Sequence, residues 1–208
     1  MNINEQNKLK ITVVGLGYVG LPLALALARK FSVIGYDADF MRISELKANK
    51  DRTGEVLAAK LLDTSIKFVS ELSKTPSCDL FIVAVPTPID DKKKPNLHAL
   101  EKASSEVGGC LSRGSVVVYE STVFPGATED ICGPILEEAS GLACGEDFYL
   151  GYSPERINPG DKDHAIESVT KVIAGQTPEV TKLLASVYGT VIPAGIYAAP
   201  NIRTAEAA

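Results

Sequence analysis

A glycine-rich turn between a strand-like and a helix-like segment constrains the fold most. Residues 10–14 (KITVV) form a β-branched run typical of a buried strand, and residues 18–29 carry apolar side chains at helical spacing. The turn between them reads G-x-G-x-x-G: Gly15 permits a tight turn, Gly17 lets the backbone approach a pyrophosphate, and Gly20 allows close helix-on-strand packing. A fortuitous glycine-rich turn is the alternative, but the strand-turn-helix context predicts dinucleotide binding.

An acidic residue stands where such a unit needs one. Asp37 follows the second predicted strand, residues 31–36, about 20 residues after the first glycine, where a carboxylate accepts hydrogen bonds from ribose hydroxyls. Asp37 would repel a 2′-phosphate, so we predict NAD rather than NADP as the cofactor. Arg42 lies too far along the next helix to overturn this preference, and we include it with Tyr18 and Val19 among the candidate cofactor-binding residues.

Strands and helices alternate along the chain. Strands are predicted at residues 10–14, 31–36, 66–69, 79–85, 115–119, 148–152 and 171–174. Helices are predicted at residues 18–29, from Asp39, at 50–64, from Asn96, from about Thr128 with a split at Gly133-Pro134, and from Thr177 to Gly189. In the first helix, Leu21, Leu25 and Ala28 are predicted to face inward. This order predicts an α/β fold with a Rossmann-type, doubly wound, mostly parallel sheet that binds ligands outside the carboxyl ends of its strands.

The length of 208 residues suits one domain with a small appendage. We expect residues 1–199 to form the dinucleotide-binding domain and residues 200–208 to begin a linker helix. That last segment starts like a capped helix but stops within about two turns, and a helix so short is marginal alone. We therefore expect the natural protein to continue past Ala208.

Composition excludes several classes of partner. The formal net charge of −5 argues against nucleic acid or an anionic membrane as the main partner, since both need a concentrated basic face. No apolar run approaches the ~20 residues of a membrane span. The four cysteines lack CxxC spacing and follow no export signal, so we expect reduced thiols and a cytoplasmic location. We expect no metal site, because His98 and His164 are isolated from the cysteines and from each other.

Two further predicted strands end in segments that carry hydroxyl residues. Residues 85–88 read VPTP and residues 120–123 read ESTV. Each segment brings a hydroxyl to a carboxyl strand end, where it can touch a cofactor or a reacting oxygen, although loop capping is an equal alternative for Thr87 and Ser121. The candidate cofactor-binding residues here are Val85, Pro86, Thr87, Ser121 and Thr122.

The strand at 148–152 empties into SPERINPG, residues 153–160. A surface turn is one explanation, since prolines and glycines punctuate loops. The other is an active-site loop, because Glu155 reaches the same sheet edge and a carboxylate there can act as acid or base, or position a water. The candidate substrate-binding residues are Glu155, Arg156, Ile157 and Asn158.

Four motifs in this order, GLGYVGLPLA, VPTP, ESTVFPG and GYSPERINPGDK, resemble the nucleotide-sugar 6-dehydrogenases, the family of UDP-glucose and GDP-mannose dehydrogenases. They look most like the branch acting on UDP-N-acetylglucosamine or UDP-N-acetylgalactosamine in bacterial surface-polysaccharide synthesis. The resemblance covers nearly the whole chain. It implies oxidation of the C6 alcohol to a carboxylate with two NAD, through a cysteine-bound thiohemiacetal and thioester.

The resemblance also implies roles for individual residues. The three glycines and Asp37 match the cofactor fingerprint, Thr87 and Thr122 match residues beside the nicotinamide and the reacting carbon, and Glu155 matches the glutamate that handles water. In the UDP-glucose branch a second glutamate follows four residues later, but Pro159 stands there, so Arg156 and Asn158 are expected to contact substrate instead.

The family's nucleophile lies in a Gly-Gly-x-Cys motif, and its lysine lies beyond the A-E-A-A stretch, both past Ala208. None of the four cysteines here matches that motif. We expect this chain to bind NAD without turnover, and the complete protein to form a homodimer. Two alternatives remain: another NAD-dependent dehydrogenase of the β-hydroxyacid type, and a non-catalytic nucleotide-binding module.

Overall fold

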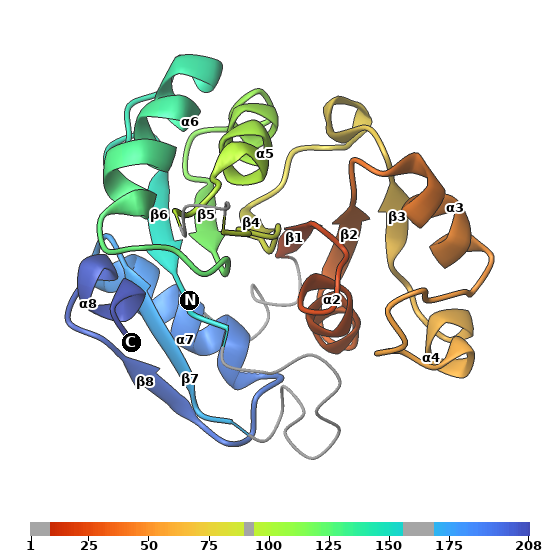
Figure 1. Ribbon diagram of the computed structural model, residues 1–208. Helices are drawn as coiled ribbons and strands as arrows, with labels where there is room; N and C mark the ends of the chain where they lie inside the picture. The colour runs from red at the N-terminus through yellow and green to blue at the C-terminus, as the bar shows by residue number, and fades with distance from the viewer. Residues whose placement is uncertain (1–8, 90–93, 156–168) are drawn as a thin grey trace.

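The computed structural model describes residues 9–89, 94–155 and 169–208. Within them, eight strands form one sheet in the order β3-β2-β1-β4-β5-β6-β7-β8 (Figure 1). The strands are β1 (Lys10–Val14), β2 (Ser32–Tyr36), β3 (Lys67–Val69), β4 (Leu80–Val83), β5 (Val116–Tyr119), β6 (Tyr149–Tyr152), β7 (Lys171–Gly175) and β8 (Ile196–Ala198). All neighbouring pairs are parallel except β6 and β7. The predicted doubly wound, mostly parallel sheet is confirmed.

Helices cover both faces of this sheet. They are α2 (Gly20–Ala28), α3 (Phe40–Lys47), α4 (Ala58–Leu62), α5 (His98–Gly108), α6 (Gly133–Ser140), α7 (Pro178–Gly189) and α8 (Ile202–Glu206), with a 3₁₀ turn η1 (Leu72–Lys74) and a π-helical segment η2 (Ala127–Cys132). Apolar residues of α2, α3, α4 and α7 form one core with one face of the strands, while α5, α6 and α8 complete a second core on the other face. Figure 1 shows α5 and α6 on one side of the sheet and α2 and α7 on the other.

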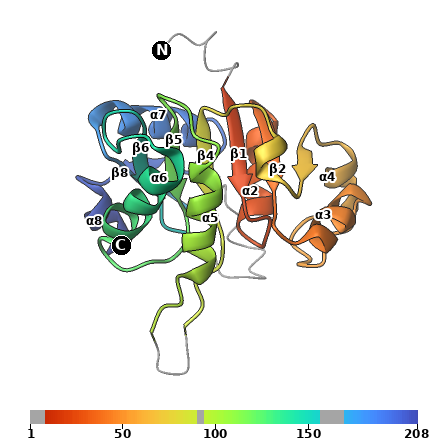
Figure 2. The ribbon, with the colours of Figure 1, turned by 90° about the horizontal axis from the view of Figure 1, so that it is seen from above.

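The parallel strands end at a common line. Tyr36, Val14, Val83, Tyr119 and Tyr152 lie opposite one another in successive pairs across β2, β1, β4, β5 and β6. The segments that follow these five strands therefore all leave from one edge of the sheet. Near that edge the chain on either side of residues 90–93 projects beyond α5 (Figure 2).

Several predicted elements differ in detail. The helix predicted at residues 50–64 is reduced to the five residues of α4. In α2, Leu25 and Ala28 are only partly buried, whereas Leu23 and Leu27 are fully buried, because the helix is apolar around its whole circumference and buries more than one stripe. Leu97 rather than Asn96 is the N-cap of α5, although Asn96 Oδ1 accepts a hydrogen bond from the backbone N of His98 (3.0 Å).

Candidate functional site

In the glycine-rich turn, two of the three glycines have no room for a side chain and the third has open space beside it. Gly15 has φ +91°, and a Cβ there would lie 2.9 Å from the Ala84 carbonyl oxygen. A Cβ on Gly20 would lie 1.9 Å from the Gly15 oxygen, so α2 and the turn pack too closely for a side chain. A Cβ on Gly17 would meet nothing within 4 Å. The turn therefore leaves open space at Gly17, beside the N-terminus of α2.

Both backbone groups of Leu16, inside the turn, are held by side chains. Asp37 Oδ2 accepts from the Leu16 N–H (2.9 Å), and Arg42 Nε donates to the Leu16 carbonyl (2.9 Å). Arg42 is 4% exposed, and its Nη2 lies 2.7 Å from Asp51 Oδ1. The structure thus gives Arg42 a supporting position behind the turn, and its contact with a cofactor stays a prediction. Sequence reasoning missed Asp51, which lies in the segment predicted as helix.

The loops after β4 and β5 are joined by the two predicted hydroxyls. Ser121 Oγ donates to the Val85 carbonyl (2.6 Å), and Thr87 Oγ1 donates to the Thr122 carbonyl (2.5 Å). Both hydroxyls cap loops, which is the alternative raised by the sequence, and this capping fixes the two loops against each other. The side chain of Thr122 is exposed, as are those of Pro86 and Tyr18, while Val19 and Val85 are partly buried.

A buried cluster of charged groups lies next to these loops. Lys171 Nζ donates a hydrogen bond to Glu120 Oε2 (2.8 Å) and lies 3.3 Å from Glu155 Oε2. The Tyr188 hydroxyl donates a hydrogen bond to Glu120 Oε1 (2.5 Å). The side chains of Glu120, Lys171 and Glu155 are 0%, 6% and 9% exposed. Two carboxylates therefore share one ammonium group in the protein interior.

The electrostatics of this cluster follow from burial and pairing. Burial raises the pKa of Glu120 above its ordinary value, and this outweighs the opposite effect of Lys171. Burial would lower the pKa of Lys171, but the carboxylates of Glu120 and Glu155 outweigh it and raise that pKa. Lys171 therefore stays protonated. Sequence reasoning missed Lys171 and Tyr188 because each reaches Glu120 only through tertiary structure, and no local pattern signals such a contact.

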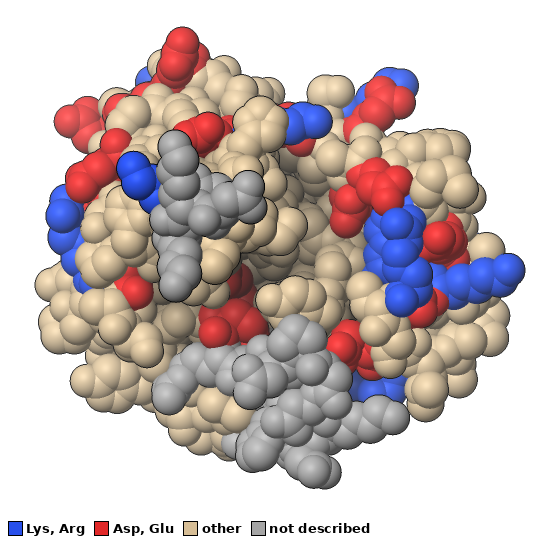
Figure 3. All heavy atoms as spheres, in the orientation of Figure 1, with Lys and Arg blue, Asp and Glu red and all other residues tan. Residues whose placement is uncertain are grey.

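Glu155 ends the described part of the SPERINPG loop. It follows β6 and lies at the same sheet edge as the glycine-rich turn and the two joined loops. Arg156, Ile157 and Asn158, the other predicted substrate-binding residues, lie outside the described residues, as does Pro159. On the face of the molecule shown in Figure 3, acidic side chains are visible in the recessed central part.

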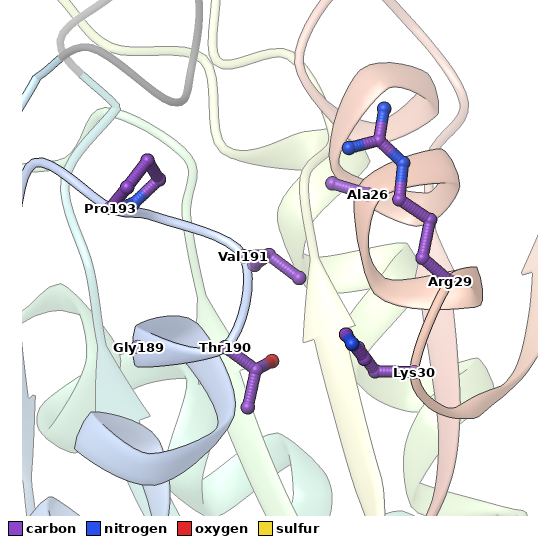
Figure 4. Close-up of a pocket in the computed structure, with 7 residues that line it drawn as sticks. All are labelled: Ala26, Arg29, Lys30, Gly189, Thr190, Val191 and Pro193. Carbon is purple, nitrogen blue, oxygen red and sulfur yellow. The ribbon is translucent and has the colours of Figure 1, made fainter.

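A half-open pocket in the described part of the structure lies apart from these residues. It has a volume of about 270 Å³ and lies between the carboxyl ends of α2 and α7, lined by Arg29, Lys30, Thr190 and Val191 among others (Figure 4). It contains none of the predicted site residues. Among the described residues no group of three or more histidine, cysteine, aspartate or glutamate side chains could hold a metal ion. None of the described helices is long and apolar enough to span a membrane.

The geometry can be compared with known proteins. Residues 9–192 match the family model "UDP-glucose/GDP-mannose dehydrogenase family, NAD binding domain". The chain is 54% identical over 198 residues to protein CapL of Staphylococcus aureus, covering 95% of this chain and 47% of that protein. It is 52% identical over 201 residues to UDP-N-acetyl-D-glucosamine 6-dehydrogenase of Pseudomonas aeruginosa, covering 96% and 48%.

Solved structures agree with these matches. A UDP-D-ManNAc dehydrogenase from Pyrococcus horikoshii superimposes with a TM-score of 0.86 at 30% identity, covering 95% of this chain and 48% of that one. An NDP-N-acetyl-D-galactosaminuronic acid dehydrogenase from Methanosarcina mazei gives a TM-score of 0.89 at 29% identity, covering 98% and 46%. The chain thus spans about half the length of the curated relatives that it matches.

Proposed function

This chain belongs to the UDP-glucose/GDP-mannose dehydrogenase family, whose NAD-binding domain it contains, and from that premise we propose that it serves a UDP-N-acetylhexosamine 6-dehydrogenase. The complete protein would oxidise the C6 alcohol of a UDP-sugar to a carboxylate with two NAD. One observation carries the proposal: five parallel strands end in register and bring the glycine-rich turn, the two joined loops and Glu155 to one edge. The identities above 50% to CapL and to a UDP-N-acetyl-D-glucosamine 6-dehydrogenase support this substrate class.

NAD, when bound, accepts a hydride from the carbon that is oxidised. The backbone at Gly17 and the N-terminus of α2 would bind the pyrophosphate. Asp37 would accept hydrogen bonds from the adenosine ribose, and the loops carrying Thr87 and Thr122 would orient the nicotinamide half. The pyrophosphate and ribose assignments are supported by the open space at Gly17 and by the position of Asp37 beside the turn. The nicotinamide assignment is supported by the family resemblance and by the bond that joins the loops of Thr87 and Thr122.

Glu155 would handle the proton of the attacking water in the second half-reaction. Lys171 lies 3.3 Å from its carboxylate, and the remaining bonds of Lys171 go to Glu120 and the Pro154 carbonyl. This arrangement supports a carboxylate that is fixed in direction before substrate arrives. Arg156, Ile157 and Asn158 remain candidate substrate ligands.

The thiol that the chemistry requires would come from outside this chain. Burial raises the pKa of each of the four cysteines above its ordinary value, so none is an activated thiolate. We therefore propose that the 208-residue chain binds NAD but does not turn over. We further propose a cytoplasmic homodimer for the complete protein, without nucleic acid or membrane partners. The net charge of −5 supports the absence of a nucleic-acid or anionic-membrane partner, and the four free cysteines support a reducing compartment.

Isothermal titration calorimetry of the purified chain tests the proposal. NAD is expected to bind at least roughly tenfold more tightly than NADP, because Asp37 disfavours a 2′-phosphate. Mixing the chain with NAD and UDP-N-acetylglucosamine is expected to give no steady production of NADH. Equal affinity for NADP would contradict the cofactor assignment. Steady NADH production that is abolished by substituting one of the chain's own cysteines would contradict the assignment of the thiol.

A further inference from the structure

Glu206 is a buried carboxylate with an unusual set of partners. It lies in α8 and is 7% exposed. Its Oε2 accepts from the backbone N–H of Gly126 (2.5 Å), and its Oε1 accepts from that of Thr128 (2.8 Å). These donors lie about 80 residues earlier in the chain, at the start of η2. Residue 206 also lies outside the range 9–192 matched by the family model.

The two N–H groups need such a partner. The first N–H groups of a helical segment have no acceptor within the helix, and a carboxylate satisfies them while favouring the positive end of the helix dipole. Hydrogen bonds to a charged acceptor are also stronger than neutral ones. Because the contact is buried, it is screened much less than an exposed one. Figure 1 and Figure 2 show α8 beside the helical segment that leads into α6.

This contact fixes one end of the segment that carries Thr122. At the other end, Ser121 is bonded through Oγ to Val85, and its carbonyl accepts from the Tyr152 hydroxyl (3.1 Å). The backbone carbonyl of Thr122 accepts a hydrogen bond from the Thr87 hydroxyl. Residues 121–128 are therefore held at their start by the strand-end loops and at their end by Glu206. Thr122 lies next to the first anchor, a few residues before Gly126, and its side chain is exposed at the ligand-binding edge.

We propose that Glu206 is a positioning residue for the cofactor site: its carboxylate holds residues 121–128 so that Thr122 keeps its place beside the nicotinamide. The inference rests on the proposed function. It makes α8 a support of the cofactor site through the 121–128 segment, which carries Thr122. Loosening this contact would disturb the nicotinamide half of the site and leave the adenosine half, built from the glycine-rich turn and Asp37, intact.

The test compares NADH with ADP-ribose, which lacks the nicotinamide. Glu206→Gln keeps the size of the side chain but removes its charge and one acceptor. We expect it to weaken NADH binding by roughly three- to tenfold, with ADP-ribose affinity within about twofold of wild type. Arg203→Gln is the matched control, since Arg203 lies on the same helix and makes exposed ion pairs with Asp130 and Glu129. It is expected to change neither affinity by more than about twofold.

Two results with Glu206→Gln would overturn the positioning role of Glu206. Equal losses for NADH and ADP-ribose in Glu206→Gln would overturn the inference and make Glu206 a general structural residue, and so would unchanged NADH binding. If Glu206→Gln does not fold, as judged by circular dichroism, Glu206→Asp keeps the charge and shortens the side chain, and the same selective loss for NADH is expected. Failure of the wild-type chain to bind NADH and ADP-ribose would overturn the proposed function together with this inference, whereas normal wild-type binding with an unselective variant overturns the inference alone.

Discussion

The peptide groups of Leu16 show how single side chains shape the cofactor site. Asp37 holds its N–H, and Arg42 holds its carbonyl and pairs with Asp51. Burial would raise the pKa of Asp51, but hydrogen bonds from Thr53, Arg42 and backbone N–H groups outweigh it and lower that pKa. Asp51 is therefore a buried carboxylate that depends on Arg42 for its charge balance, and the turn depends on both.

Replacing Arg42 tests this dependence. Arg42→Met leaves the buried Asp51 carboxylate without its paired cation, although Thr53 and Val56 still donate to it, and leaves the Leu16 carbonyl without its donor. We expect a loss of roughly 3–5 kcal/mol in the free energy of unfolding. Arg42→Lys keeps the charge and is expected to cost less, about 1–2 kcal/mol. Urea unfolding followed by circular dichroism measures both. Arg52→Gln, which removes an exposed pairing to Glu45 and Asp39, is the control and should change stability little, and an equal loss in the control would contradict the prediction.

Lys171 gives a prediction with a pH dependence. Lys171→Met leaves Glu120 buried without its cation, and we expect a loss of roughly 3–5 kcal/mol at pH 7. In wild type the folded-state pKa of Glu120 is raised above its ordinary value of 4.5, so protonation of Glu120 favours the folded state. The stability that Glu120 contributes is therefore fully present below pH 4.5 and is lost as the pH rises through the folded-state pKa.

Lys171 opposes the rise in the pKa of Glu120, so Lys171→Met should raise that pKa further. The variant should therefore recover part of its lost stability when the pH is lowered from 7 to 5, because Glu120 then takes up a proton. Urea unfolding at the two pH values measures the recovery relative to wild type. Lys182→Met, at an exposed position of α7, should show no such recovery. A variant whose deficit is the same at both pH values would argue against Glu120 as the affected group.

At the scale of elements, local signals predicted some parts of the fold and not others. Helix α7 was predicted closely because Thr177 caps it through Oγ1 to the Val180 N–H (3.3 Å) and Pro178 occupies its first turn. The buried strands β4 and β5 were predicted from unbroken apolar runs. Strand β8 was not predicted, because it is three residues long and mostly exposed and gains strand geometry only by pairing with β7.

The same division applies to the candidate site. The site residues that were predicted from sequence follow strands, because a local motif marks each of them and the parallel topology brings the strand ends to one edge. Glu120 lies within ESTV but was not among the predicted site residues, and its partners Lys171 and Tyr188 lie 51 and 68 residues away in the chain. Glu206 and Asp51 likewise gain their partners through tertiary contact. One sequence without pairing information cannot specify such contacts, so the supporting residues of the site were missed.

At the junction of β1 and α2, substitutions at two glycines of one motif are expected to differ in their effect on stability. Gly17→Ala adds a methyl group where nothing lies within 4 Å, so the free energy of unfolding should change by less than about 1 kcal/mol, while NAD binding falls at least roughly tenfold because the methyl group occupies the pyrophosphate's space. Gly20→Ala places its methyl group 1.9 Å from a backbone oxygen, so both stability and binding should fall.

Thermal unfolding and calorimetry of the two variants separate these effects. Wild-type chain measured in parallel is the reference. A Gly17→Ala variant that binds NAD normally would show that the open space is not the pyrophosphate site. A Gly20→Ala variant as stable as wild type would show that the turn relaxes more easily than its close packing indicates.

At the scale of the whole molecule, the proposed cofactor site joins both halves of the sheet. The glycine-rich turn and Asp37 lie on the β1–β2 side of the point where strand order reverses, and Thr87 and Thr122 lie on the β4–β5 side. The two apolar cores share the central strands, since alternate residues of β1, β4 and β5 enter opposite cores. A ligand that spans the reversal point is therefore expected to stabilise the molecule as one unit.

NAD linkage tests this expectation. At a free concentration of 100 times its Kd, NAD should raise the free energy of unfolding by about 2.7 kcal/mol in a single transition. Amide hydrogen exchange should slow both at residues 15–20 and at residues 116–122, because opening either side of the sheet would break the same site. NADP at the same concentration is the control and should stabilise less, since Asp37 disfavours the 2′-phosphate. Slowing that is confined to residues 15–20 would mean that the cofactor engages only the adenosine side, and the assignment of Thr87 and Thr122 to the nicotinamide side would then fail.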